Sequence, residues 1–86
     1  MNILIYDKFP IVRNAIMYII ENNFPNTKIT IAKSIEDIFL LGFKQEFNIL
    51  FGDFDLEIRD IDILLKKIKF LNPKLKIIFF LINIQI

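Results

Sequence analysis

The sequence predicts an α/β chain in which a parallel sheet carries helices on both faces. Four short apolar runs rich in β-branched residues have the length and composition of buried strands. A segment with helical spacing of apolar residues lies between each run and the next, and the connections are short. Such alternation favours right-handed crossovers and parallel strands. At 86 residues the chain has room for a single domain.

The first strand and helix are predicted from residues 2–26. The run "NILIY" (2–6) is continuously apolar, as expected of a strand that is buried on both faces. Pro10 then stands where proline is favoured, in the first turn of a helix. We expect this helix to end within "ENNFPN" (21–26), where Asn residues and Pro25 interrupt it. Its predicted apolar stripe consists of Ile11, Val12, Ala15, Ile16, Ile19 and Ile20.

The second strand and helix follow in the same order. "KITIA" (28–32) predicts a strand, and Ser34 is a candidate N-cap for the helix after it. Asp37 lies three residues further on, which makes "SIED" a weak variant of the capping box. The helix is expected to continue through Ile38, Phe39 and Leu41.

The third and fourth strands enclose the last helix. "NILFG" (48–52) predicts a strand that leads into an acidic segment (53–60), and Asp60 is a candidate N-cap. "NP" (72–73) stops the helix, and "KIIFFLI" (76–82) predicts the fourth strand. The helix is indicated by Ile61, Leu64, Leu65 and Ile68, at positions i, i+3, i+4 and i+7.

Composition excludes several classes of function. Eleven Lys and Arg nearly balance ten Asp and Glu, so no strong field indicates nucleic acid or membrane as a partner. Without Cys or His the chain cannot build a disulfide framework, a zinc knuckle, or a Ser–His or Cys–His nucleophile. The longest apolar run (77–82) is far shorter than the ~20 residues of a membrane span. The start "MNILIYDK" does not read as a signal peptide, so we expect a cytoplasmic protein.

Three groups of side chains have both a structural and a functional interpretation. The lysines of "KKIK" (66–69) could contact phosphate, but a solvated helix face is the favoured interpretation. Glu57, Asp60 and Asp62 could belong to a metal loop, but acids near a helix N-terminus are favoured by its dipole alone. A stacking platform for nucleic acid is conceivable for the phenylalanines, but without a basic groove we predict core packing for positions 39, 43, 47, 51, 54, 70, 79 and 80.

Three motifs resemble the receiver domains of bacterial two-component response regulators, especially the branch with a LuxR-like DNA-binding domain. "ILIYDKFPIVR" resembles their opening, and "FNILFGDFDL" resembles the third strand that ends on the phosphoacceptor aspartate. "NPKLKIIFFL" resembles the passage into their fourth strand. The resemblance implies a flavodoxin-like, doubly wound sheet of four strands in the order 2-1-3-4 with three helices.

The resemblance also implies a site at the carboxyl ends of the strands. Asp53 matches the phosphoacceptor, Asp7 matches the first acid of the acidic pair, and the backbone carbonyl of Asp55 matches a Mg²⁺ ligand. This chemistry is physically reasonable, because a carboxylate can attack a phosphoryl group only if a hard cation gathers the negative charge.

Three departures from the family pattern change these expectations. Lys8 stands in place of the second acid, so we expect weak Mg²⁺ binding, and its ammonium could instead pair with Asp53 or Asp7. Leu81 stands in place of a Thr or Ser, with Asn83 as a poorer polar substitute. The sequence ends at Ile86, before a fifth strand and its Lys, so a receiver truncated after the fourth strand is expected.

The expected function is that of a truncated receiver, a signalling and interaction module rather than an enzyme. The implied partners are a histidine kinase or a full-length response regulator, with no direct binding to nucleic acid or membrane. An alternative is a phosphorylation-independent or anti-regulator subunit that pairs through its fourth strand, and another is a remnant without activity. Because an apolar edge strand is a template for pairing, self-association is also expected. The residues of this predicted interaction strand are Lys76, Ile77, Ile78, Phe79, Phe80, Leu81 and Ile82.

Overall fold

The computed structural model describes residues 1–7, 9–53 and 58–79, and in this part of the chain strands and helices alternate as predicted. All strand pairs are parallel and the order across the sheet is β2-β1-β3-β4, which confirms the doubly wound, flavodoxin-like arrangement. The elements are β1 (Asn2–Tyr6), α1 (Pro10–Asn23), β2 (Lys28–Ala32), α2 (Ile35–Lys44), β3 (Ile49–Gly52), α3 (Ile58–Leu71) and β4 (Lys76–Phe79).

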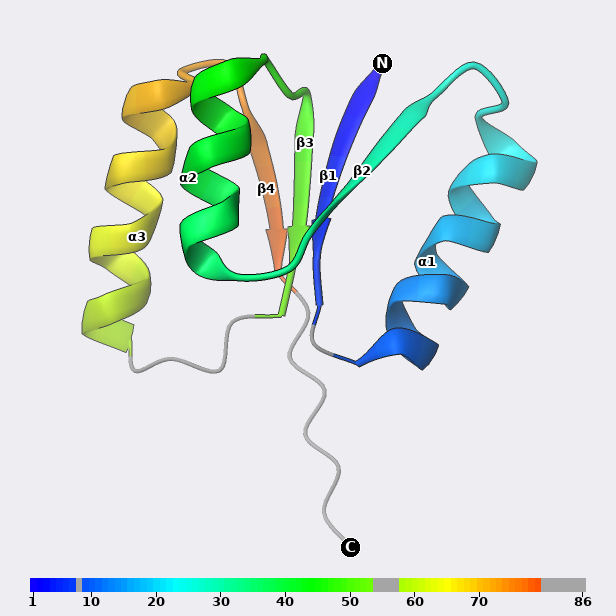
Figure 1. Cartoon of the computed structure of the whole chain (residues 1–86), viewed down its shortest axis with the longest axis horizontal. Coiled ribbons are helices and arrows are strands. Elements are labelled where there is room, and N and C mark those ends of the chain that lie inside the picture. Colours follow the sequence, from blue (N-terminus) through cyan, green and yellow to red (C-terminus); the bar gives the residue numbers. More distant parts are fainter. Residues whose placement is uncertain (8, 54–57, 80–86) are drawn as a thin grey trace, which may run out of the picture.

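The helices form one layer on each side of the sheet, with α2 and α3 together on one face and α1 on the other (Figure 1). Strand β1 supplies both layers of the core, because successive side chains of a strand point to opposite faces. Leu4 packs in the cluster that includes α2 and α3, whereas Ile3 and Ile5 pack with Ile20 of α1. This double burial explains why residues 2–6 are continuously apolar.

The core under α2 and α3 is the larger of the two clusters. Its apolar contacts hold the sheet to both helices. As a separate finding, no helix in the described part of the chain is long and apolar enough to cross a membrane. The buried members of this cluster are Leu4, Ala32, Ile38, Phe47, Leu50, Leu64, Ile68 and Leu75.

The N-terminus of α2 matches its prediction in detail. The hydroxyl oxygen of Ser34 accepts a hydrogen bond from the backbone N–H of Asp37 at 3.1 Å. The carboxylate of Asp37 accepts one from the backbone N–H of Lys33 at 2.9 Å, one residue earlier than in a standard capping box. Both contacts fix the exit of the chain from β2.

The predicted start of α3 is wrong. The helix begins at Ile58, so Asp60 lies within its first turn and is not the N-cap. An acid in the first turn is still favoured by the helix dipole, which is why Asp60 looked like a boundary in the sequence.

The predicted apolar stripe of α1 is only partly correct. Ile20 is buried, and Ile16 and Met17 pack beside it against the sheet. Ile11 is 85% exposed and Ile19 is also exposed. With roughly 3.6 residues per turn, Ile11 and Ile20 fall on opposite sides of the helix, so one stripe could not bury both.

Among the phenylalanines that the structure describes, the prediction of core packing is wrong at two positions, while Phe54, Phe80 and the Phe79 side chain lie outside the described residues. Phe47 is buried and Phe39 is partly buried against the larger cluster. In contrast, Phe43 is 81% exposed and Phe70 is 85% exposed. Both side chains lie on parts of α2 and α3 that do not face the sheet.

Candidate functional site

Asp7 and Asp53 meet at the carboxyl edge of the sheet. Strands β1 and β3 are parallel neighbours with Tyr6 opposite Gly52, and each acid is the next residue along its strand. The backbone N–H of Asp53 donates a hydrogen bond of 3.1 Å to the carbonyl oxygen of Tyr6. Because neighbouring strands lie about 4.8 Å apart, the two carboxyl groups come from adjacent points on this edge.

Asp7 is a buried acid with one unsatisfied oxygen. Its side chain is 3% exposed, and Oδ1 accepts a hydrogen bond of 2.8 Å from the backbone N–H of Phe9. This contact is an Asx-turn, which fixes the carboxyl group as the chain turns from β1 towards α1. Oδ2 is also buried, and no residue in the described part of the chain hydrogen-bonds to it. A buried carboxylate oxygen without a partner is unfavourable unless a donor or a cation reaches it.

Asp53 has a different environment from Asp7. As a residue it is half-buried, whereas Asp7 is buried. The arrangement therefore places one partly exposed acidic residue and one buried acidic residue at neighbouring strand ends. An accessible carboxylate is suited to attack an incoming group, whereas a buried and oriented one is suited to hold a cation in a fixed place.

The donor set is compatible with Mg²⁺. This ion usually binds to one or two carboxylates and keeps several waters, and Asp7 Oδ2 and the Asp53 carboxylate supply that number of charged ligands. Residues 1–7, 9–53 and 58–79 contain no group of three acidic side chains that could hold a metal. The other residues predicted for this site, Lys8 and Asp55, lie outside the described residues.

The predicted interaction strand is described only in its first half. Backbone pairing of β4 with β3 covers Lys76 to Phe79, and in the described part of the chain no strand pairs with the other side of β4. Lys76 is exposed, Ile77 packs against the larger core cluster, and Ile78 is 41% exposed. The Phe79 side chain and all of Phe80, Leu81, Ile82 and Asn83 lie outside the described residues.

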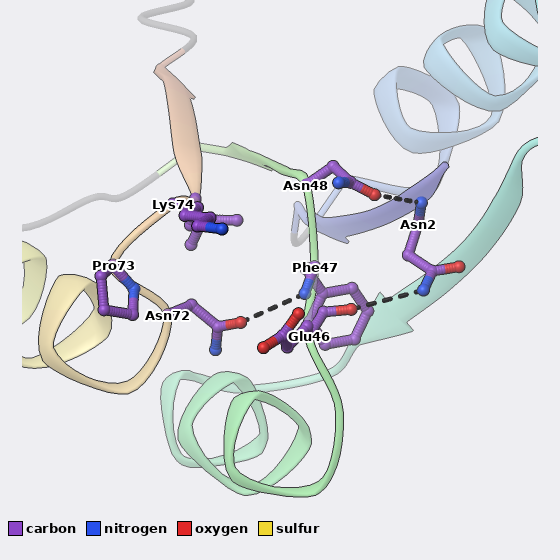
Figure 2. A pocket seen from close by; sticks show the side chains of 8 residues that line it. Asn2, Glu46, Phe47, Asn48, Asn72, Pro73 and Lys74 are labelled. Carbon is purple, nitrogen blue, oxygen red and sulfur yellow. Dashed lines mark hydrogen bonds between the residues drawn. The ribbon is translucent and has the colours of Figure 1, made fainter.

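A pocket of about 470 Å³ lies at the opposite, amino-terminal edge of the sheet and was not predicted (Figure 2). Its amide side chains bind the backbone. Oδ1 of Asn48 accepts a hydrogen bond of 2.7 Å from the N–H of Asn2, and Oδ1 of Asn72 accepts one of 3.2 Å from the N–H of Phe47. These contacts tie the loops before β3 and β4 together, so the pocket is a structural junction. Its sequence signal was an Asn at the start of β1 and directly before β3, together with an Asn directly after α3.

Comparisons with known proteins identify no relative. No family model matches the chain, and no curated protein and no solved structure matches it either. The function must therefore be argued from the motifs and from the geometry of the carboxyl edge.

Proposed function

We propose that this chain is a receiver-like signalling module in which Asp53 accepts a phosphoryl group and Asp7 helps to hold Mg²⁺. The observation that carries the proposal is that Oδ2 of Asp7, beside the end of β3, is buried and has no hydrogen-bond partner among the residues that the structure describes. A fold gains nothing from such an oxygen, since an unsatisfied buried acceptor lowers stability. Its retention is explained if a cation binds there during function.

In the proposed reaction an oxygen of the Asp53 carboxylate attacks the phosphorus of the donor. A bond forms from this oxygen to phosphorus, the bond from phosphorus to the donor breaks, and the donor departs with that electron pair. A bound Mg²⁺ supplies positive charge next to the transferring group. The N–H of Phe9 keeps the Asp7 carboxyl group oriented towards this edge while the more exposed Asp53 receives the group.

The resemblance supplies the rest of the proposal. A histidine kinase or a small phosphodonor would provide the phosphoryl group, and a kinase or a full-length response regulator would be the binding partner in the cytoplasm. The cation Lys8 next to Asp7 in the sequence is expected to weaken Mg²⁺ binding, because it adds a positive charge where the family has an acid. The role is signalling by protein interaction rather than catalysis.

Intact-mass spectrometry after incubation with acetyl phosphate and Mg²⁺ tests the proposal. The parent chain should gain one phosphoryl adduct that hydroxylamine removes, as an acyl phosphate requires. Asp53→Asn should gain none, and Asp7→Asn should gain much less at the same Mg²⁺ concentration. Asp62→Asn is the matched control, because Asp62 is an exposed acid on α3 that pairs with Lys66. An adduct that persists in Asp53→Asn, or none in the parent, contradicts the proposal.

A second candidate is a phosphorylation-independent module that pairs through β4. Two observations on β4 favour it. Ile78 is exposed, and within the described residues β4 pairs with another strand on one side only. The two candidates differ in their need for Asp53. Association that is unchanged in Asp53→Asn and unaffected by acetyl phosphate would favour this second function.

A further inference from the structure

A shallow groove of about 420 Å³ lies between the outer sides of α2 and α3. Its lining is almost wholly apolar. Phe43 is exposed one turn after Phe39, at i+4 on the same side of α2. The groove is lined by Phe39, Lys66, Lys67, Phe70 and Leu71.

The aromatic side chains at this groove are not needed to attach the helices to the sheet. Ile38 of α2 and Leu64 and Ile68 of α3 are the buried residues that pack in the core. Phe43 and Phe70 are more than four-fifths exposed, so they contribute little to that packing. Large exposed aromatic side chains beside an apolar groove are typical of a protein interaction site.

The charged groups at the groove are positive. Lys67 is exposed and has no ion pair within the described residues, and Lys66 pairs with Asp62 across an exposed contact of 3.0 Å. Lys44 does not line the groove, but it is an exposed positive charge in the last turn of α2, next to Phe43 in the sequence. An apolar floor with a positive rim complements a surface that is apolar in the centre and acidic at its margin.

We propose that the α2–α3 groove, lined by Phe39, Lys66, Lys67, Phe70 and Leu71 and followed along α2 by the exposed Phe43, binds an acidic amphipathic helix of a partner protein. The apolar face of such a helix would lie on the phenylalanines, and its carboxylates would reach the lysines. A groove between two helices suits this mode of recognition, in which anchors at i, i+3, i+4 and i+7 fill an apolar channel. Buried aromatic side chains in the middle of an interface also supply much of the binding energy.

Charge and shape argue against other occupants. A second copy placed groove to groove would bring Lys66 and Lys67 against the same lysines, and like charges across an interface are unfavourable. A flat bilayer surface does not fit into a groove. A nucleic acid would find only one lysine in the lining without an ion pair within the described residues, Lys67, and its phosphates need more positive charge than that. An acidic helix satisfies both the apolar channel and the lysines.

This surface is separate from the proposed phosphorylation site. Phe43 and Phe70 lie in the last turns of α2 and α3, at the end of the sheet opposite the carboxyl edge that carries Asp7 and Asp53 (Figure 1). Binding at the groove therefore does not depend on the role of Asp53. Both proposals can be tested independently on the same chain.

Selection from a displayed library of random helix-length peptides tests this inference. The parent chain is the bait, and the double variant Phe43→Gln and Phe70→Gln is the counter-selection. Enriched peptides should carry apolar residues at i, i+3, i+4 and i+7 with Asp or Glu on the flanks. No enrichment, or enrichment of basic or uncharged sequences, overturns the proposal.

Titration of the best selected peptide gives the residue-level test. Phe70→Gln and Lys67→Glu should each weaken binding at least tenfold, and replacing the peptide's acids by lysines should do the same. Tyr18→Gln and Lys28→Glu are matched controls, because both residues are exposed and lie on α1 and β2, away from the groove. Equal binding by Lys67→Glu, or binding lost equally in Tyr18→Gln, overturns the assignment. Circular dichroism of each variant confirms that the fold is retained.

Discussion

The side-chain Nδ2 of Asn72 donates a hydrogen bond of 3.0 Å to the carbonyl oxygen of Gly42, which joins the end of α3 to the last turn of α2. The carbonyls of a last helical turn have no partner within their own helix, so Asn72 satisfies a group that the helix cannot. Its Oδ1 accepts from the N–H of Phe47 at 3.2 Å, and Asn72 itself is buried. One amide therefore fixes both the end of α2 and the start of the loop before β3.

Replacing Asn72 by Ala should lower the free energy of unfolding by about 2–3 kcal/mol, because it removes the partner of the buried N–H of Phe47 and of the partly buried carbonyl of Gly42. Urea denaturation followed by circular dichroism measures the change. Asn23→Ala is the control, since Asn23 is exposed and its Nδ2 donates to the carbonyl of Ile19 within α1 at 2.7 Å. That change should stay within about 0.5 kcal/mol. Equal losses in both variants would contradict the role given to Asn72.

Replacing Gly42 by Ala should destabilise the chain, although Ala is the better helix former by about 1 kcal/mol. A Cβ at position 42 would lie 3.2 Å from Nδ2 of Asn72, and that side chain is held at both ends. The sign should reverse when Asn72 is Ala, because the contact is then absent. A double-mutant cycle of the two changes measures this coupling, and simple additivity would show that the close approach has no energetic effect.

The sequence predicted the sheet well because each strand has a local signal that the fold reinforces. Residues 2–6 are apolar on both sides, and the structure packs both sides. The Ser34 cap was also predictable, since a short polar side chain directly before a helix accepts a hydrogen bond from a backbone N–H of the first helical turn. For the carboxyl edge, the parallel order alone brings Asp7 and Asp53 together.

Other features depend on contacts that periodicity does not reveal. The pattern around Phe43 and Phe70 gives their spacing but not which side of each helix the sheet occupies, so the core prediction failed there. Asn72 was interpreted only as part of a helix stop, because its partners Gly42 and Phe47 are distant in sequence. The buried state of Asp7 likewise follows from the turn to Phe9 and from packing, not from local composition.

Removing the Ser34 hydroxyl should lower the free energy of unfolding by about 1 kcal/mol, since the N–H of Asp37 then loses its acceptor. Ser34→Ala tests this by thermal and urea denaturation. Ser34→Gly should cost only a few tenths of a kcal/mol, because glycine leaves the helix end open to water. If Ala and Gly destabilise equally, the hydroxyl contact does not stabilise α2.

Self-association through β4 should depend on Ile78, whose side chain is 41% exposed on the strand with one described partner. The mass of the parent chain in light scattering should rise with concentration, and Ile78→Lys should reduce that rise because a lysine on an edge strand opposes pairing. Ile63→Lys is the matched control, since Ile63 is similarly exposed but lies on α3. A sharp monomer peak of the parent at high concentration would contradict the prediction.

Replacing Asp7 by Asn should separate stability from function. The amide oxygen can still accept from the N–H of Phe9, while the buried charge disappears together with Oδ2, which has no partner within the described residues. The amide NH2 that replaces Oδ2 is a buried donor, but an unpaired neutral donor costs less than an unpaired buried charge. In the absence of Mg²⁺ the free energy of unfolding should therefore rise by about 1–2 kcal/mol. Millimolar Mg²⁺ should stabilise the parent, because a ligand that binds only the folded state shifts the equilibrium towards it, and should leave Asp7→Asn unchanged.

Urea denaturation measures the free energy of unfolding of the parent and of Asp7→Asn, each with and without Mg²⁺. Asp37→Asn serves as the control for a removed carboxylate, because the Asp37 carboxylate already has a partner, the backbone N–H of Lys33. That variant should lose stability and keep its response to Mg²⁺. If Asp7→Asn is less stable than the parent without Mg²⁺, the Asp7 carboxylate has a partner that stabilises the fold. That result would contradict the proposal that Asp7 lowers the stability of the fold in order to bind a cation at the carboxyl edge.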